Sequence, residues 1–424
     1  MNQGCIPTKY LLHQTQMLRE LKDNTNIDGP LEKIKLNWAR VQEGKRDSVN
    51  KLVKGIEFLL KKNGVQIIRG EARLKSEREL SVQSQEETRI FSDKIILAAG
   101  SESACLPFLQ PNGKKIITSK DALELNELPD SLLIVGAGAI GLEMGTIFHR
   151  MGCDVTILEV MTNVLPGIDR DMAVRMERLL KVQGLKIHTQ MKIEKCDLEN
   201  GAAVLEGINL KTSSRFDFEA DKILLATGRT PNSEGLKGRD ARLEFDPHGF
   251  LKVDHNLETG IPGIYAIGDL IGGKLLAHKA SHEGITAVEN ACGKLRAMNY
   301  SALPSAVFIE PEFAYVGITE TEAKEKCLPV FSGLFSLQAN SRALTMSKPD
   351  GMVKILSDSE ERIVGAQILS PHASEIIMEV TLAIQNGLKL SDLSSVVHIH
   401  PTLSEAVMEA ALKAKGEAIH MLNT

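Results

Sequence analysis

The chain has 424 residues, of which 43% are apolar and 25% are charged, and its formal net charge is −5. This composition is typical of a soluble globular protein of two to four domains, and the weakly acidic balance disfavours nucleic acid or an anionic membrane as a partner. No apolar run approaches the ~20 residues that span a bilayer. The six cysteines are too dispersed for a secreted disulfide framework or a metal site, which indicates a reducing compartment, the cytoplasm or, in a eukaryote, the mitochondrial matrix.

The first predicted elements are helical. Gly4 and Cys5 precede Pro7, a residue suited to the first turn of a helix. Cys5 is therefore expected at a helix N-terminus with Lys9 one turn later on the same face, and both features favour a reactive thiolate. A buried, unreactive cysteine is the alternative. Residues 13–63 continue the helical pattern.

Short strands are expected at residues 65–69, 80–83 and 94–101, the last ending in a Gly-Ser turn. Residues 222–228 repeat the same strand-to-glycine pattern. Two matching turns of this kind suggest two related nucleotide-binding halves, joined by a connection at residues 107–129.

Residues 132–159 contain a strand, a helix and a second strand, with the turn Gly136-Ala137-Gly138-Ala139-Ile140-Gly141 after the first strand. Gly136 allows a tight turn, Gly138 allows close approach of a diphosphate, and Gly141 lets the helix lie against the strand. The diphosphate would rest on free N–H groups at the helix start. An ordinary turn with spare glycines is the alternative.

An acidic residue ends the second strand of this unit. Glu159 lies eighteen residues after Gly141, where a carboxylate can accept hydrogen bonds from both ribose hydroxyls and repel a 2′-phosphate. The next residues, Val160 and Met161, supply no arginine for such a phosphate. This pattern favours NAD over NADP.

A further strand at residues 263–268 ends on Asp269, ahead of a helix that residues 283 and 284 begin. A carboxylate just past a strand end can accept hydrogen bonds from the sugar-like hydroxyls of a ligand. A simple Gly-Asp turn is the alternative.

From about residue 301 the pattern becomes that of an α+β module, a kind of module that commonly forms an interface. Its strands are expected at 306–310, 313–317, 330–338, 353–357 and 362–369, and its helices at 375–386 and 405–415. Near the end, Glu405 follows His400 and could orient its imidazole as a general base. Thr402-x-x-Glu405 is also a helix capping box, so a structural role for these residues is the alternative.

Six ordered motifs resemble those of the flavin-dependent pyridine nucleotide-disulfide oxidoreductases, and the resemblance spans the chain. Within that family it is closest to the branch that oxidises dihydrolipoamide with NAD, because of Cys-Ile-Pro-Thr-Lys and Glu159. The motifs are Gly4–Lys9, Ala98–Ser101, Gly136–Glu143, Ala226–Arg229, Ala266–Asp269 with Leu276-Ala277-His278, and His398–Glu405.

The resemblance implies an α/β fold with two Rossmann-like domains, for FAD and NAD, the first of them incomplete, and a C-terminal α+β dimerisation domain. The FAD domain would occupy residues 1–129 and return at 233–302. The NAD domain would occupy 130–232, and the dimerisation domain 303–424.

The resemblance also implies roles for individual residues. Cys5 would be the thiol beside the flavin, Lys9 and Glu143 an ion pair near it, and His400 a base oriented by Glu405. FAD would be held by Lys9, Ala72, Gly100, Ser101, Asp269, Leu275, Leu276, Ala277 and His278, and NAD by Gly136, Ala137, Gly138, Ala139, Ile140, Gly141, Glu143, Glu159 and Gly228. The implied partners are a second copy of the chain and the lipoyl domains of 2-oxo acid dehydrogenase or glycine cleavage complexes, with no metal.

One motif departs from the family pattern. In the family the redox-active cysteines have the spacing Cys-x-x-x-x-Cys. Counting back five places from Cys5 passes Met1, so the interchange cysteine and the first glycine-rich FAD loop are not among the 424 residues. We therefore expect an N-terminally truncated chain with little or no lipoamide turnover. Two other hypotheses stay open: a non-catalytic remnant that binds NAD and dimerises, and an NADH diaphorase without dithiol chemistry.

Overall fold

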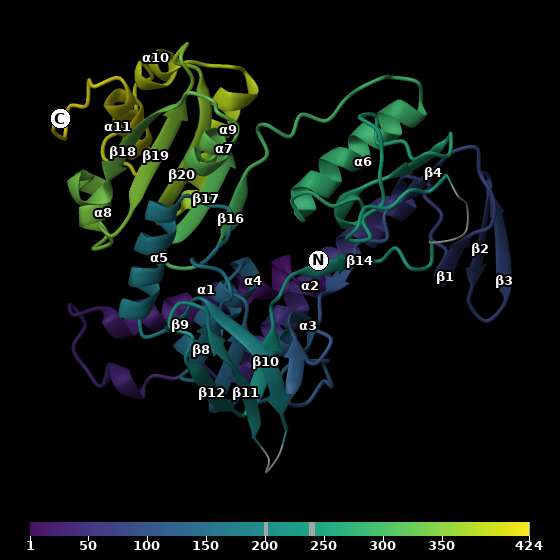
Figure 1. The fold of residues 1–424 in the computed structure, drawn as a ribbon, viewed down its shortest axis with the longest axis horizontal. Helices are drawn as coiled ribbons and strands as arrows, with labels where there is room; N and C mark the ends of the chain where they lie inside the picture. The colour runs from purple at the N-terminus through teal and green to yellow at the C-terminus, as the bar shows by residue number, and fades with distance from the viewer. Residues whose placement is uncertain (199–201, 237–241, 424) are drawn as a thin grey trace. The chain divides into compact units, whose positions relative to one another are not determined.

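The computed structural model describes residues 1–198, 202–236 and 242–423. The chain divides into two compact units (Figure 1). The first unit comprises residues 1–50, 105–227 and 301–424, and the second comprises residues 51–104 and 228–300. Residues 237–241 of the expected returning FAD segment, and residue 424 of the expected dimerisation domain, lie outside the described residues.

A parallel five-stranded sheet forms the centre of the first unit. Its strand order is β6-β13-β7-β8-β9, and its strands are buried almost throughout, as expected for a parallel sheet covered by helices. The strands are β6 (Ile116–Thr118), β7 (Ser131–Val135), β8 (Asp154–Leu158), β9 (Lys186–His188) and β13 (Lys222–Leu225).

The helices of this part follow the predicted strand, helix, strand order. The helix α4 (Ala139–Arg150) joins β7 to β8 and packs on both, and α5 (Arg170–Val182) precedes β9. The short α3 (Ser119–Leu123) follows β6. A separate antiparallel sheet, β10-β11-β12, is made of Met191–Asp197, Ala203–Asn209 and Arg215–Ala220.

The N-terminal segment forms two helices where the sequence predicts one helical run over residues 13–63. The helix α1 (Cys5–Asp23) packs against α4, and α2 (Trp38–Lys62) follows after the short η1 (Leu31–Lys33). The residues between the helices include Asn24, Asn26, Gly29 and Pro30, all of which favour turns over a helix.

The C-terminal module of the first unit is an antiparallel sheet of order β16-β17-β20-β19-β18. The strands are β16 (Ser305–Val307), β17 (Glu312–Gly317), β18 (Phe331–Ser336), β19 (Met352–Ser357) and β20 (Ile363–Ser370), so all five predicted strands are confirmed. Figure 1 shows α9 and α11 beside this sheet; α9 packs on β17 and β20, and α11 packs on β18 and β19. The helices are α7 (Glu320–Glu325), η4 (Leu337–Ala339), α8 (Ser341–Thr345), α9 (Ala373–Gln385), α10 (Leu390–Ser394) and α11 (Glu405–Ala414).

In its described residues the second unit contains three small sheets, the second half of α2 and one further long helix. Parallel pairing joins β4 (Ile95–Leu97) to β15 (Ile264–Ala266), which places the ends of two distant strands together. The other elements are β1 (Glu71–Leu74), β2 (Glu79–Gln83), β3 (Glu87–Phe91), β5 (Ser101–Ser103), β14 (Arg229–Pro231), η3 (Gly268–Ile271) and α6 (Ala277–Ala291).

Two predictions for this unit are wrong. Residues 65–69 form no strand, and Val65, Ile67 and Ile68 are exposed, because a strand needs a hydrogen-bonded neighbour and the described residues offer none there. The helix α6 begins at Ala277, earlier than predicted, since residues 277–282 continue its turns ahead of Glu283.

Candidate active site

An ion pair links the helix that carries Cys5 to the helix that follows the glycine-rich turn. Lys9 Nζ lies 2.8 and 2.7 Å from the two carboxylate oxygens of Glu143, which is largely buried in α4. The Phe308 backbone N–H donates to the same carboxylate at 3.0 Å, and the Phe308 ring lies 4.2 Å from Lys9 Nζ. Glu143 therefore gathers three distant segments at one point in the first unit.

Cys5 is the first residue of α1 and is exposed. Gly4 provides the N-cap without a side-chain hydrogen bond, so the first N–H groups of the helix have no side-chain acceptor at the cap. The ammonium of Lys9, which the sequence places near the thiol, is paired with Glu143. Thiolate character at Cys5 thus stays a prediction.

The glycine-rich turn has the geometry that its three glycines were expected to allow. Gly136 has φ +108°, and a Cβ there would lie 2.4 Å from the Ala226 carbonyl oxygen. A Cβ on Gly141 would lie 1.9 Å from the Gly136 carbonyl oxygen, so the helix can approach the strand only without it. Gly138, the N-cap of α4, faces open space. A diphosphate fits this arrangement of free space beside N–H groups.

Glu159 has a role in the protein that sequence analysis did not reveal. Its carboxylate accepts hydrogen bonds from the Ala137 N–H at 2.7 Å and the Met161 N–H at 2.8 Å, and the residue is buried. A carboxylate has about four lone-pair sites, so these bonds leave acceptor capacity for ribose hydroxyls. Glu159 therefore links the glycine-rich turn to the residues that follow β8.

Ser101, Asp269 and Arg229 form a polar cluster where β4 and β15 end in the second unit. Ser101 Oγ donates to the Asp269 carboxylate, and the Arg229 guanidinium donates to Ser101 Oγ at 2.7 Å and to the Ser101 carbonyl at 2.6 Å. Arg229 Nε lies 3.7 Å from Asp269 Oδ2. The sequence named Ser101 and Asp269; Arg229 stood in a quoted motif, but its contacts depend on pairing of β5 with β14.

A buried network supports the turn before Asp269. Glu283 accepts hydrogen bonds from the Gly268 N–H at 2.8 Å and the Tyr300 hydroxyl at 2.7 Å, and its carboxylate lies 2.9 Å from Lys279 Nζ. Glu283 and Lys279 are buried. Burial, together with this carboxylate, raises the pKa of Tyr300. The network ties α6 to the strand end that presents Asp269.

The remaining residues expected to hold FAD lie in the same unit. Ala72 is exposed in β1, and Gly100 has φ +72° after β4. Leu276 is the N-cap of α6, between Leu275 and the first helical residues Ala277 and His278.

The remaining residues expected to hold NAD lie in both units. Gly228 belongs to the second unit and has φ +114°. Ala139 and Ile140 open α4 in the first unit.

His400 and Glu405 are paired as expected for an oriented imidazole. His400 Nδ1 lies 2.9 Å from Glu405 Oε1, while Glu405 Oε2 accepts the Thr402 N–H at 2.8 Å. Burial by itself raises the pKa of Glu405, but these hydrogen bonds and the charge of the histidines outweigh it, so the pKa is lowered. The capping-box prediction is only half right, because α11 has Ser404 as its N-cap and Thr402 Oγ1 has no hydrogen-bond partner.

A second histidine–glutamate pair lies nearby, and the sequence analysis assigned no role to it. His398 Nε2 lies 2.9 Å from Glu379 Oε1, and its Nδ1 lies 2.9 Å from the Val396 carbonyl oxygen. His400 is 70% exposed at its side chain, whereas His398 is 5% exposed. The hydrogen bonds of His398 thus hold the segment from His398 to His400 in place, whereas the His400 side chain is accessible to solvent.

Across residues 1–198, 202–236 and 242–423, no three His, Cys, Asp or Glu side chains are grouped to hold a metal ion. In the same residues no helix has the length and apolar character that crossing a membrane requires.

A parallel sheet with a glycine-rich turn, a polar cluster at the ends of β4 and β15, and a cysteine at a helix start are the features of a nucleotide-dependent oxidoreductase. The family model for pyridine nucleotide-disulphide oxidoreductases matches residues 1–284, and the model for the dimerisation domain of the same family matches residues 303–411. The chain belongs to the pyridine nucleotide-disulphide oxidoreductase family. It is therefore a member of a family of FAD-containing, pyridine-nucleotide-linked flavoproteins with a C-terminal dimerisation domain.

Named relatives are similar over the whole chain. Dihydrolipoyl dehydrogenase of Thermus scotoductus is 39% identical, with 100% of this chain and 91% of that protein aligned. The protein of the same name from Bacillus subtilis is 38% identical, with 99% and 92% aligned. The expectation of a truncated chain gains no support from these alignments.

Two solved structures share the fold. The structure of LpdA from Mycobacterium tuberculosis matches with a TM-score of 0.87 at 25% identity, covering 97% of this chain and 90% of that one. The HOCl-induced flavoprotein disulfide reductase RclA from Escherichia coli, as its Cu(II) complex, matches with a TM-score of 0.83 at 27% identity, covering 97% and 89%.

Proposed function

We propose that the protein is a dihydrolipoyl dehydrogenase: it oxidises dihydrolipoamide to lipoamide with NAD⁺, releasing NADH and one proton. Relatives with that name are 36–39% identical over nearly the whole chain, which supports this substrate over other disulfides. The observation that carries the proposal is the Lys9–Glu143 ion pair, because it joins the Cys5 helix to the dinucleotide helix in one unit.

The protein's own groups suit the proposed chemistry. Cys5 presents an exposed sulfur, and when it is oxidised in a disulfide with a second protein cysteine, a substrate dithiol could reduce that disulfide by thiol–disulfide exchange. His400, held at Nδ1 by Glu405, leaves Nε2 to take the proton of a substrate thiol. A dithiol that becomes a disulfide loses two electrons and two protons; one proton and the electron pair leave as hydride, and the other proton leaves through the histidine.

The residues present fit the two cofactors of the family. Gly136, Gly138 and Gly141 leave space beside the start of α4 for the NAD diphosphate, and Glu159 with no following arginine favours NAD over NADP. The Asp269 carboxylate, with Ser101, would hold hydroxyls of FAD, and Ala72, Gly100 and residues 275–278 would line it. Bound FAD supplies a two-electron carrier between thiols and nicotinamide.

Two partners follow from the proposal. A second copy of the chain is expected at the dimerisation domain, since His400 is exposed in the single chain and a base must approach the thiols of the other. Lipoyl domains of a 2-oxo acid dehydrogenase or glycine cleavage complex would deliver the dithiol.

The test is a comparison of electron acceptors. The FAD-reconstituted chain and its Cys5→Ser variant are assayed with NADH against lipoamide and against ferricyanide, with Cys292→Ser as a control for another exposed cysteine. We expect Cys5→Ser to abolish lipoamide reduction and to spare ferricyanide reduction. Lipoamide reduction that survives in Cys5→Ser rejects the proposal.

One observation favours a second candidate, an NADH diaphorase. Thiol–disulfide exchange uses a pair of protein sulfurs, and among the described residues Cys5 is a free cysteine that forms no disulfide. A diaphorase would reduce ferricyanide and leave lipoamide untouched in both the parent chain and Cys5→Ser. A chain that binds neither flavin nor NADH would instead support a non-catalytic role.

A further inference from the structure

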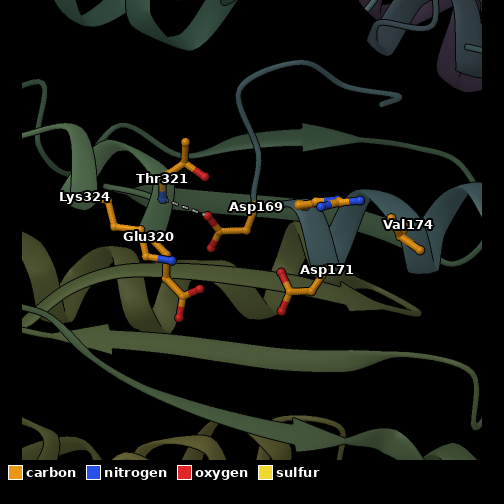
Figure 2. A pocket seen from close by; sticks show the side chains of 7 residues that line it. Asp169, Asp171, Val174, Glu320, Thr321 and Lys324 are labelled. Atoms are coloured by element: carbon orange, nitrogen blue, oxygen red, sulfur yellow. Dashed lines mark hydrogen bonds between the residues drawn. The ribbon is translucent and has the colours of Figure 1, made fainter. Parts of the chain in front are cut away.

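A buried lysine of the C-terminal module pairs with acidic residues at the start of α5. Lys354 Nζ, on β19, lies 2.6 Å from Asp171 Oδ2, 3.4 Å from Asp169 Oδ2 and 3.3 Å from Glu320 Oε2. The Lys354 and Asp169 side chains are 4% and 3% exposed. Figure 2 shows Asp169 and Asp171 on one side of a small hollow and Glu320 and Thr321 of α7 on the other.

Asp169 is the junction of this cluster. Its carboxylate also accepts the Thr321 N–H at 3.3 Å, and its own N–H donates to Gln367 Oε1 at 3.2 Å. Lys354, Thr321 and Gln367 all belong to the C-terminal module, whereas Asp169 is the N-cap of α5. The end of the 160–169 loop is therefore fixed by groups that lie far away in sequence.

The other end of the same loop is fixed to the glycine-rich turn. The Leu165 N–H donates to the Ala137 carbonyl at 3.0 Å, and Glu159 accepts the N–H groups of Ala137 and Met161. Leu165 has φ +46°, a conformation that a residue with a branched side chain adopts only when its surroundings impose it. The loop is held between Asp169 and Ala137.

We propose that Lys354 and Asp169 are positioning residues for the pyridine nucleotide: through the 160–169 loop, the C-terminal module holds the turn that binds NAD. This inference rests on the proposed NAD site. An uncharged residue at 354 leaves Asp169 buried without its cation. The 160–169 loop then relaxes, and with it the hydrogen bond from Leu165 to Ala137.

The experiment compares Lys354→Met with a matched control, Arg175→Gln. Arg175 of α5 also reaches across to the C-terminal module, to Asp350 at 3.2 Å, but this pair is partly exposed and lies away from the loop. We expect Lys354→Met to raise the Kd for NADH and the KM for NAD by about tenfold while kcat changes little, because a misplacement of about 1 Å can cost about 100-fold and the loop keeps its contacts other than those of Lys354. Arg175→Gln should leave the affinity for NADH unchanged.

Hydrogen exchange provides a readout that needs no nucleotide. The amides of residues 136–141 should exchange faster in Lys354→Met than in the parent chain or Arg175→Gln. Unchanged exchange there, or an unchanged KM for NAD, overturns the inference. Failure of the parent chain itself to bind NADH rejects the proposed function, and the exchange experiment still decides the inference about the loop.

A second variant covers the case in which Lys354→Met does not fold. Asp169→Asn keeps the shape of the side chain and an oxygen for the Thr321 N–H, and it removes only the charge that faces Lys354. The same rise in KM for NAD and the same faster exchange are expected, and a variant that behaves like the parent chain contradicts the proposal.

Discussion

At the scale of single residues, the Lys9–Glu143 pair gives a prediction about stability. Lys9→Met leaves a mostly buried carboxylate with only the Phe308 N–H as a partner. We expect the free energy of unfolding to fall by about 1–3 kcal/mol, below the full value for a buried pair because Lys9 is a third exposed. Glu143→Gln should cost less, since an amide oxygen can still accept the Phe308 N–H. Urea unfolding of the two variants measures both losses of free energy. Equal losses in Lys9→Met and Glu143→Gln would contradict this ranking.

Glu405 gives a prediction about pH. Its folded pKa is lowered, despite burial, by the Thr402 N–H and by His400. Its stabilising contribution is therefore present above the ordinary carboxyl pKa of about 4.5 and is lost as the pH falls through the folded pKa. The parent chain should lose more unfolding free energy than Glu405→Gln between pH 6 and pH 3. Parallel curves for the two proteins would show that Glu405 contributes nothing to acid sensitivity.

At the scale of elements, α6 and the segment after it hold the turn before Asp269. Tyr300→Phe removes one hydrogen bond to Glu283, so we expect a loss of about 1 kcal/mol in unfolding free energy at neutral pH. Because the Tyr300 pKa is raised, this contribution is lost only as the pH rises through the folded pKa. In an alkaline absorbance titration, the last tyrosine to ionise should be missing from Tyr300→Phe.

The sequence predicts helices and strands well where the hydrophobic periodicity and the positions of turn residues indicate the same boundaries. The unit around the glycine-rich turn and the five strands of the C-terminal module follow from such patterns. The break between α1 and α2 could have been predicted, because Gly29 and Pro30 are turn residues. Residues 65–69 have the residues of a strand but no neighbouring strand. The contacts of Phe308, Arg229 and Lys354 could not be predicted, because each depends on segments brought together by tertiary packing.

The second half of α2 exposes an apolar face. Leu52, Ile56 and Leu59 share one side of the helix at spacings of four and three and are exposed. We expect Ile56→Lys to change the unfolding free energy by less than about 0.5 kcal/mol and to reduce binding of a hydrophobic dye. Val41→Lys, at a buried position of the same helix, should cost about 3 kcal/mol or more. A large loss in Ile56→Lys would mean that another surface covers this face.

At the scale of the whole molecule, the dimerisation domain exposes apolar side chains on α9 and near His400. Met378 and Leu382 lie one turn apart on α9 and are exposed, as are Val397 and Ile399. We expect Leu382→Asp to shift the chain from dimer to monomer in light scattering and to lower lipoamide turnover while NADH binding persists. Val182→Asp, at an exposed position of α5, is the control. A dimer that survives in Leu382→Asp would exclude this face.

The strand pair β4 and β15 joins residues 95–97 to residues 264–266. During synthesis at about 5–20 residues per second, β4 emerges from the ribosome roughly 10–30 s before its partner exists. During that interval the apolar residues of β4 lack the strand with which they pair in the folded second unit. Chaperone dependence during translation should therefore concentrate in this interval, well before the last helix is made.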